Sequence, residues 1–452
     1  MEFKNLLFIA SFALVPLVQA QTSYQVGATT VYVDTLIDNL SVPWEIKVEE
    51  DTHLWVTERE GLVSRVDLIT GVKDTVLDLT SDVHTVGESG LLGLALHPNF
   101  PAIAEVFMVY TYGPEDNQGY FKERLVKYTF DGTDLIDPDT LIENIMAWSN
   151  HDGSRLHFLP DNTLLMSTGE CSQSQLSQDS NSLSGKYLRL NTDGSIPSDN
   201  PIPGSYVYSM GHRNSQGICA LPNGKVVISE HGPSTDDELT VLESGKNYGW
   251  PLIHGFCDET FEDTPCATGL YQEPIHTWTP TIATSDLVFY ENAGFPEWNN
   301  RLLMVTLNGQ RVVAMELDAL TTSVVDEDQY FQGIFGRLRD IAVGPNKEIY
   351  IATNSGSHPI IRLTPSSPLG ITELQDETSL IVPNPAEIYI HLASDNRAEQ
   401  VTILDLNGKT VMDLKQVEAG EQIDISRLAP GTYSVEVKFA GVDRIQRQKL
   451  MK

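Results

Sequence analysis

Short apolar runs follow one another along most of the chain from Val31, and Gly, Asn, Asp and Pro separate them. Few stretches carry the three-to-four-residue period of an amphipathic helix. Short strands at regular spacing, each bounded by turn residues, are typical of an all-β sandwich, barrel or propeller. The pattern therefore predicts an all-β protein and leaves these three folds open.

A repeat favours one of them. A Pro-Asx-type turn leading into an apolar strand recurs at roughly 60-residue intervals, and its six copies surround Pro98, Pro160, Pro222 and Pro345 and occupy 48–61 and 295–309. We predict a six-bladed β-propeller over residues 21–365, with its ligand at the central channel. Leu188–Leu190 and Ile360–Leu363 are expected to be outer, fourth strands.

The stretch from Tyr208 to Pro251 combines apolar strands with many polar side chains. Turn residues at 222–224 join the runs 218–221 and 226–228, which predicts a hairpin. We expect the hairpin to bring Arg, Asn and His to one end and a Gly-Pro pair with three carboxylates to the other. This arrangement suits a ligand site.

The sequence character changes at both ends of this region. Residues 1–20 carry Lys4, an apolar run and a small-x-small cleavage signature, so we predict a signal peptide. Residues 366–372 indicate a linker. Alternating strands and the turns Asn407-Gly408 and Ala429–Gly431 predict a small β-sandwich over residues 373–452. No later segment is long and apolar enough to cross a membrane.

Export permits disulfides. Cys257 and Cys266 bracket a short loop and are the more favourable pair, whereas pairing of Cys171 with Cys219 is left open. The formal charge of −33 disfavours nucleic acid and anionic lipid as partners. It could favour cations, or simply keep the protein soluble.

Three groups of residues could carry chemistry. His151 precedes a predicted strand and could act as a general base, or it could simply brace a loop; His97, His157 and His212 lie nearer strand interiors. A planar anionic cofactor would suit the guanidinium forks and amide of Arg213, Asn214, Arg337 and Arg339. Arg337 and Arg339 alternate at strand spacing, so both should project from one face, although a solvated edge is the alternative.

The third group is the Gly232-Pro233 loop with Asp236, Asp237 and Glu238. Carboxylate and carbonyl oxygens are the ligands of calcium. An acidic surface turn is the alternative, because the chain is acidic throughout.

From Val42 to Pro365 the chain resembles the quinoprotein glucose and aldose sugar dehydrogenases of the glucose/sorbosone dehydrogenase family. The matching segments occur in the family's order and are GESGLLGLALHPNF, NHDGSRLHFLPD, GKYLRLNTDGSIPSDNP, YSMGHRNSQG, SEHGPSTDDEL, GKNYGWP and GRLRDIAVGP. The resemblance implies a six-bladed propeller that binds pyrroloquinoline quinone (PQQ) and calcium.

The resemblance also implies residue roles. His151 would take the proton of the sugar's anomeric hydroxyl, and Arg213 would polarise the quinone and hold the substrate oxygen. The cofactor-binding positions would be Glu88, His151, Arg213, Asn214, Asn308, Arg337 and Arg339. Calcium would be held by the carbonyl oxygens of Gly232 and Pro233, and a second calcium by Glu238, the Tyr248 carbonyl and Asp258.

Two positions depart from the family pattern. Glu88 stands where some members have Gln, and Asn308 aligns with a cofactor-binding lysine of the glucose dehydrogenases, with Arg311 nearby but out of register. Long insertions of the glucose-specific enzymes are also missing around Tyr271–Phe289. These departures favour the broader sugar dehydrogenase branch.

Residues from about Ile371 to Lys452 resemble the sorting domain of type IX secretion, on VPNP, LNGK and LAPGTYSV. This resemblance implies passage through the periplasm and then export to the cell surface or medium by a secretion machinery.

The combined prediction is a secreted PQQ- and calcium-dependent oxidoreductase. It would convert an aldose, a small-molecule sugar, to a lactone by hydride transfer to PQQ and pass the electrons to an acceptor that the sequence does not identify. Two alternatives remain, a calcium-dependent sugar-lactone hydrolase and a non-catalytic propeller that binds carbohydrate or protein. A paired arginine clamp argues against the hydrolase, and His151, Arg213 and Asn214 argue against the binding module.

Overall fold

The computed structural model describes residues 22–49, 52–365, 381–382, 386, 388–392, 397–405, 409–439 and 445–452. The chain divides into two compact units, residues 1–368 and 369–452, and the described residues of both are mainly strands. The predicted signal peptide and the predicted linker lie outside the described residues. Among the described residues, no helix has both the length and the apolar character that a membrane span requires.

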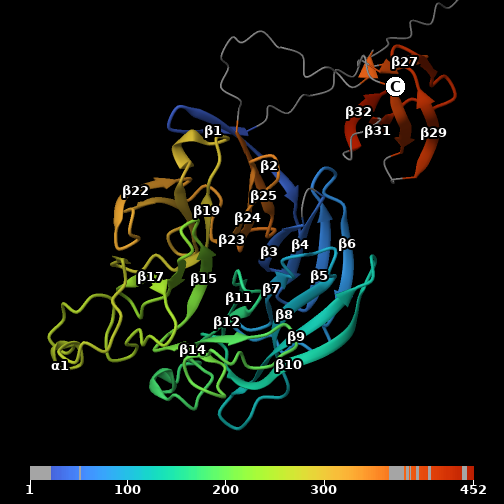
Figure 1. The fold of residues 1–452 in the computed structure, drawn as a ribbon. Helices are drawn as coiled ribbons and strands as arrows, with labels where there is room; N and C mark the ends of the chain where they lie inside the picture. Colours follow the sequence, from blue (N-terminus) through green and yellow to red (C-terminus); the bar gives the residue numbers. More distant parts are fainter. Residues whose placement is uncertain are drawn as a thin grey trace, which may run out of the picture. The chain divides into compact units, whose positions relative to one another are not determined.

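Six antiparallel sheets make up the described part of the first unit, and Figure 1 shows them arranged around a centre. Five sheets consist of four strands that neighbour one another in chain order. The first two are β3 (Pro43–Glu49), β4 (His53–Glu58), β5 (Leu62–Asp67) and β6 (Lys73–Asp78), and β7 (Leu91–Leu96), β8 (Glu105–Tyr112), β9 (Phe121–Phe130) and β10 (Leu135–Ala147). The third is β11 (Gly153–Phe158), β12 (Leu164–Thr168), β13 (Lys186–Leu190) and β14 (Val207–Met210). The fourth and fifth are β15 (Ser215–Ala220), β16 (Val226–Glu230), β17 (Asp237–Leu242) and β18 (His276–Trp278), and β19 (Thr284–Tyr290), β20 (Arg301–Thr306), β21 (Val312–Leu317) and β22 (Val324–Tyr330).

The sixth sheet joins the two ends of the unit. Its strands are β23 (Leu338–Val343), β24 (Ile349–Thr353), β25 (Ile360–Pro365), β2 (Thr29–Ile37) and β1 (Thr22–Val26), with Val33 opposite Leu363. The first strand of each sheet contacts the first strand of the next, and β23 contacts β3. This closed ring is the arrangement of a β-propeller, in which radial repetition leaves only short, protected sheet edges.

Each repeat found in the sequence falls at the connection between the first and second strands of one sheet. The expectation of fourth strands at Leu188–Leu190 and Ile360–Leu363 is wrong, because both segments lie third in their sheets, as parts of β13 and β25. The outer strand of the third sheet follows a long loop, and that of the sixth sheet comes from the opposite end of the unit. Neither of these outer strands, β14 and β2, lies within one of the sequence repeats.

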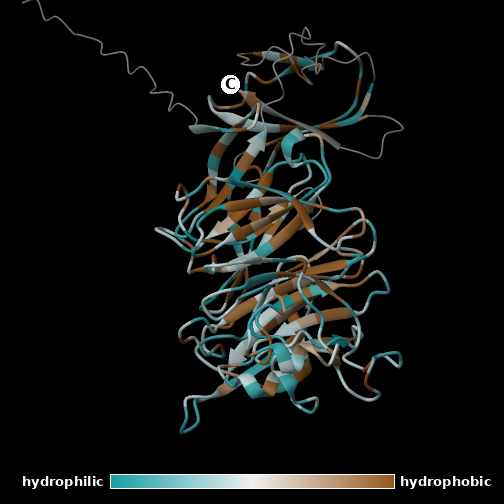
Figure 2. Ribbon diagram, turned by 90° about the vertical axis from the view of Figure 1, so that its left-hand side faces the viewer, coloured by the Kyte–Doolittle hydropathy of each residue, from teal (hydrophilic) through white to brown (hydrophobic). Residues whose placement is uncertain are grey.

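The cores of the first unit lie between neighbouring sheets. Val227 and Leu239 of the fourth sheet pack with Met304 and Val313 of the fifth, for example. Burial of alternating apolar side chains stabilises such packing, and Figure 2 shows hydrophobic residues concentrated in the strands.

The second unit contains two antiparallel sheets. One consists of β26 (Ile381–Val382), β27 (Tyr389–Leu392) and β30 (Gln422–Asp424), and the other of β29 (Thr410–Val417), β28 (Ala398–Leu404), β31 (Thr432–Phe439) and β32 (Ile445–Met451). Ile390 and Ile423 of the first share one hydrophobic core with Val401 and Val435 of the second. The predicted turn at Ala429–Gly431 precedes β31, and the one at Asn407-Gly408 lies outside the described residues.

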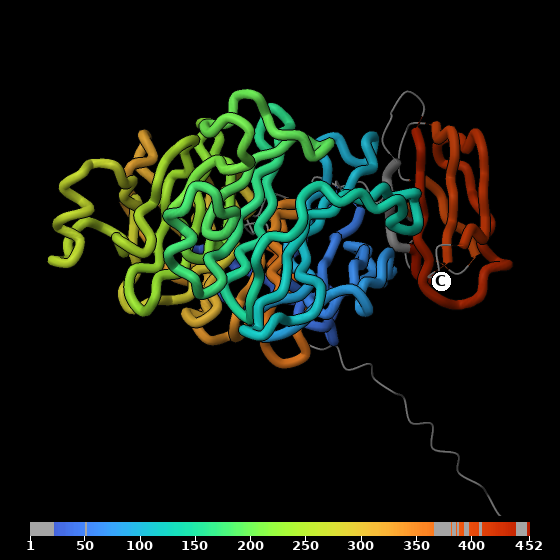
Figure 3. The backbone as a smooth tube through the Cα atoms, turned by 90° about the horizontal axis from the view of Figure 1, so that it is seen from below, coloured from blue at the N-terminus to red at the C-terminus, as the bar shows by residue number. Residues whose placement is uncertain are grey.

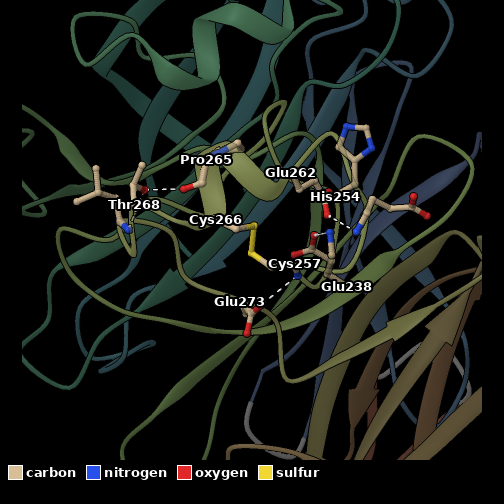
Figure 4. Close-up of a disulfide and its surroundings, with 11 residues drawn as sticks. Glu238, His254, Cys257, Glu262, Pro265, Cys266, Thr268 and Glu273 are labelled. Carbon is tan, nitrogen blue, oxygen red and sulfur yellow. Dashed lines mark hydrogen bonds between the residues drawn. A yellow bond between two sulfur atoms is a disulfide. The ribbon is translucent and has the colours of Figure 1, made fainter.

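The connection from β17 to β18 projects from the first unit and carries the short helix α1 (Asp263–Cys266) (Figures 1 and 3). The predicted disulfide between Cys257 and Cys266 is confirmed, and Cys171 and Cys219 are free and buried. Figure 4 shows this disulfide beside Glu238. Two further short helices of the first unit are the 3₁₀ segments η1 (Ser174–Gln178) and η2 (Pro296–Trp298).

Candidate active site

Most of the predicted site residues share one position relative to the sheets. The positions just before, or at the start of, a first strand hold Glu88, His151, Arg213, Asn214, Arg337 and Arg339, and those just after a second strand hold Gly232, Pro233 and Asn308. In an antiparallel sheet, the start of one strand lies beside the end of the next. All these residues therefore lie at the same end of their sheets.

This geometry corrects one expectation about the Tyr208–Pro251 hairpin. Ser215 pairs with Glu230, so Arg213-Asn214 and Gly232-Pro233 lie at the same end rather than at opposite ends. The predicted pairing of the two strands themselves is confirmed.

His151 is held in a defined orientation. Its Nδ1 is hydrogen-bonded to Oε1 of Glu170, and its backbone N–H donates to Oε2 of Glu88 at 3.4 Å. An ionised carboxylate only accepts hydrogen bonds, so Nδ1 carries the proton and Nε2 keeps the free lone pair. A Cβ at Gly169 would lie 1.7 Å from the His151 carbonyl oxygen, which explains the glycine there.

Glu170 is a site residue that the sequence reasoning missed. It is buried, and its carboxylate also accepts the backbone N–H of Ser172 at 3.1 Å. The available signal was its place two residues after β12, which corresponds to Gly232 after β16 and Asn308 after β20.

Arg213 is fixed through both of its backbone groups. Its N–H donates to the Glu230 carboxylate, and its carbonyl accepts the N–H of Glu170 at 2.9 Å. The guanidinium lies 5.3 Å from the Trp250 ring centre and donates through Nη1 to the His231 carbonyl at 3.2 Å. Its Nε is buried and has no hydrogen-bond partner among the described residues, so Arg213 has an unused donor at the site.

Two of the other three candidate histidines, His97 and His212, are buried, and His157 is partly buried. His212 is fully buried between the Ser209 hydroxyl at 2.8 Å and the Glu230 carboxylate at 2.9 Å. Burial lowers the pKa of His157 to about 4, and the buried His97 ring packs against Phe158. His151 is also only partly buried, and it differs from these three in its hydrogen bond to Glu170 at the end of the sheets where Arg213 lies.

The two arginines of the sixth sheet do not form the symmetric pair that their spacing predicted. Arg337 precedes β23 and is exposed, whereas Arg339 is buried at a β-bulge between Leu338 and Asp340. A bulge breaks the strict alternation of side chains along a strand. Burial lowers the pKa of Arg339 to about 9.

One pocket collects most of the predicted metal-binding residues. It is lined by Arg213, Glu230, Gly232, Pro233, Glu238 and Tyr248, among others. Burial raises the pKa of Glu238 to about 8. Asp258 is exposed and is not part of this lining.

The Gly232-Pro233 loop is braced by a buried carboxylate. Asp237 accepts the backbone N–H of Gly232 at 2.8 Å through Oδ1. Its Oδ2 accepts the N–H groups of Ile282 at 2.7 Å and Ala283 at 2.6 Å. The loop of the fourth sheet is therefore tied to the segment that leads into the fifth.

Asn308 lies in a second pocket, which Thr281, Arg311 and Gln332 also line. Asn308 is exposed, and Arg311 donates from Nη1 to the Gln332 side-chain oxygen at 2.9 Å. The Arg311 guanidinium thus supplies a cation in the same pocket as Asn308, although from a different sequence position than the lysine of the glucose dehydrogenases.

Comparison with known proteins gives this site a family. Residues 40–362 match the family model described as Glucose / Sorbosone dehydrogenase. The chain belongs to this family. Residues 380–451 match the model of the secretion system C-terminal sorting domain, which supports export.

Individual members of the family are similar to most of this chain. The chain is 31% identical to quinoprotein glucose dehydrogenase B of Acinetobacter calcoaceticus, over 78% of this chain and 91% of that protein. It is 28% identical to the aldose sugar dehydrogenase YliI of Escherichia coli, over 78% and 98%. The PQQ-bound structure of an aldose sugar dehydrogenase from Streptomyces coelicolor is similar with a TM-score of 0.63 and 30% identity, covering 74% of this chain and 98% of that one. The family and these members support a sugar oxidoreductase.

Proposed function

We propose that this protein is an exported quinoprotein that uses PQQ and calcium to oxidise the anomeric carbon of an aldose to a lactone. The observation that carries the proposal is the pairing of His151 with Glu170, which leaves Nε2 as a basic atom at the end of the sheets where Arg213 also lies. A sugar dehydrogenase needs a group that accepts the hydroxyl proton while hydride leaves the same carbon.

The residues present fit PQQ. Its quinone and carboxylate oxygens are acceptors on a planar frame, and Arg213, Asn214 and Arg339 offer donors. The buried Nε of Arg213, without a partner among the described residues, is the kind of atom that a ligand oxygen satisfies. The surroundings of the cofactor would be completed by Glu88, by Arg337, and by Asn308 together with Arg311.

The residues also fit calcium. Hard oxygen ligands are available from the carbonyl groups of Gly232 and Pro233 for the cofactor calcium. The Glu238 carboxylate and the Tyr248 carbonyl would serve a second, structural calcium. Asp258 would join that second site only if its exposed loop approached the pocket.

The protein's own groups would act as follows. Nε2 of His151 takes the proton from the anomeric hydroxyl, and Glu170 stabilises the resulting imidazolium and keeps the ring oriented. Arg213 holds the substrate oxygen and polarises the acceptor. The chemistry that bound PQQ supplies is acceptance of the hydride from the anomeric carbon, so the sugar loses two electrons and becomes the lactone.

Two structural details belong to the same proposal. Each of the six sheets would be one propeller blade, and the two sheets of the second unit would form a β-sandwich that a secretion machinery recognises. After signal-peptide removal the protein would pass through the periplasm and reach the cell surface or the medium.

The test is reconstitution of the metal- and cofactor-free protein. PQQ and calcium are titrated together and singly while a dye-linked oxidation of several aldoses is followed. Saturable activation that requires both additions supports the proposal. Absence of PQQ binding, measured directly by fluorescence quenching, contradicts it and favours a lactone hydrolase or a binding module.

A further inference from the structure

A buried glutamine connects two of the residues proposed to hold the cofactor. Gln216, 5% exposed on β15, accepts a hydrogen bond from Nη1 of Arg339 at 2.8 Å. Its Nε2 donates to Oδ1 of Asn214 at 3.0 Å. One side chain therefore bridges the sixth sheet to the Asn214 position of the fourth.

The direction of these hydrogen bonds is dictated by chemistry. A guanidinium has only donors, so Gln216 must turn its oxygen toward Arg339 and its NH₂ group toward Asn214. Asn214 must then present its oxygen, which also accepts the backbone N–H of Gly153 at 3.2 Å. Two donors thus fix the placement of the Asn214 amide atoms, the Gly153 N–H and the NH₂ group of Gln216, whose direction Arg339 sets.

The backbone around this chain of hydrogen bonds is fixed by a second buried arginine. Arg155 donates through Nε to the Gln216 carbonyl at 2.7 Å and through Nη2 to the Arg339 carbonyl at 3.2 Å. Its Nη1 is paired with Glu45 at 2.6 Å and Asp340 at 3.2 Å. The separation of the Gln216 and Arg339 backbones is therefore set by one side chain.

We propose that Gln216 is a positioning residue that makes Asn214 a hydrogen-bond donor toward the ligand. Asn214 Oδ1 is engaged by Gln216 and Gly153, so its NH₂ group is the part that faces away from these two donors. The site would then require an acceptor at this point, a carbonyl or carboxylate oxygen. This inference rests on the proposed function, in which Asn214 and Arg339 hold PQQ.

The first variant is Gln216→Glu, which keeps the size and the acceptor for Arg339 but has no donor for Asn214. The carboxylate repels Asn214 Oδ1, so the amide of Asn214 turns its NH₂ group inward and its oxygen toward the ligand. The second variant is Asn214→Asp, which keeps the acceptor for Gln216 and Gly153 and removes the donor itself. Each variant should weaken PQQ binding by about 10- to 100-fold, the effect of losing a hydrogen bond to a charged group.

The measurement is the Kd of PQQ for the calcium-loaded apoprotein, by fluorescence quenching, with unfolding temperature as the check of folding. The matched control is Gln178→Glu, because Gln178 makes a similar amide pair with Asn247 at 2.7 and 3.0 Å outside this network. Its Kd should equal that of the wild type.

The outcomes separate the two claims. A wild-type apoprotein that binds no PQQ overturns the proposed function and this inference with it. Wild-type binding with an unchanged Kd in folded Gln216→Glu overturns the role of Gln216 alone. If Gln216→Glu does not fold, an unchanged Kd in Asn214→Asp overturns the inferred donor.

Discussion

His151, which is partly buried, and the buried Glu170 form an imidazole–carboxylate pair through Nδ1 and Oε1. In the proposed reaction the imidazole becomes positively charged when it takes the hydroxyl proton, and the carboxylate stabilises that charge. Glu170→Gln keeps an acceptor for Nδ1 but removes the negative charge. We expect kcat to fall about 100-fold with little change in KM or in the Kd of PQQ. Steady-state kinetics of the reconstituted enzyme measure this split.

Two controls accompany Glu170→Gln. Glu143→Gln changes an exposed glutamate and should leave kcat unaltered. Glu170→Asp keeps the charge on a shorter side chain and should give an intermediate kcat. A Glu170→Gln enzyme with wild-type kcat would show that the carboxylate has no part in the proton transfer.

Removal of the base itself should have a larger effect. His151→Ala should lower kcat by about two to four orders of magnitude and leave PQQ binding largely intact, because general-base catalysis contributes on this scale. The control is His53→Ala, since His53 opens β4 at the far end of its sheet from the site. Near-normal turnover of His151→Ala would remove His151 from the mechanism.

The sequence predicted the features that are local in the chain. Turns such as the one at Pro222 mark the repeats, because the turn and both of its strands are neighbours in sequence. The pairing of β2 with β25 was not predictable in this way, because its partners Val33 and Leu363 come from opposite ends of the unit.

The same distinction applies to the site. His151 and Arg213 stand in recognisable local motifs, whereas the link between them passes through Glu170. Glu170 meets His151 across the β11–β12 hairpin, but it meets Arg213 only when the third and fourth sheets pack. The different burial of Arg337 and Arg339 depends on a β-bulge, which residue spacing does not reveal.

Asp152 should make the stability of the apoprotein pH-dependent. It is 4% exposed, and burial raises its pKa to about 8, whereas the carboxyl of an unfolded chain titrates near pH 4. Between these values the folded state binds more protons, so the free energy of unfolding falls as pH rises from about 4 to 8. Asp152→Asn removes this contribution and should be more stable than the wild type at pH 8 by up to about 5 kcal/mol.

Thermal unfolding of the metal-free protein between pH 4 and 8 checks this prediction. The difference in unfolding temperature between Asp152→Asn and the wild type should grow across that range. Asp137→Asn, at an exposed position, should show no such trend. A constant difference at all pH values would mean that the Asp152 carboxyl is ionised in the folded protein throughout.

Glu238 offers a test of the second calcium site that does not depend on turnover. Its Oε1 accepts the N–H of Gly255 at 2.9 Å, which connects it to the disulfide-closed loop of Cys257 and Cys266. A ligand that binds only the folded state raises its unfolding temperature. Calcium should therefore stabilise the wild type, and Glu238→Gln should lose most of that shift because a neutral amide is a poorer calcium ligand. Asp258→Asn changes a residue outside the pocket and should keep the shift. If Asp258→Asn loses the shift and Glu238→Gln keeps it, the ion lies in the exposed loop instead.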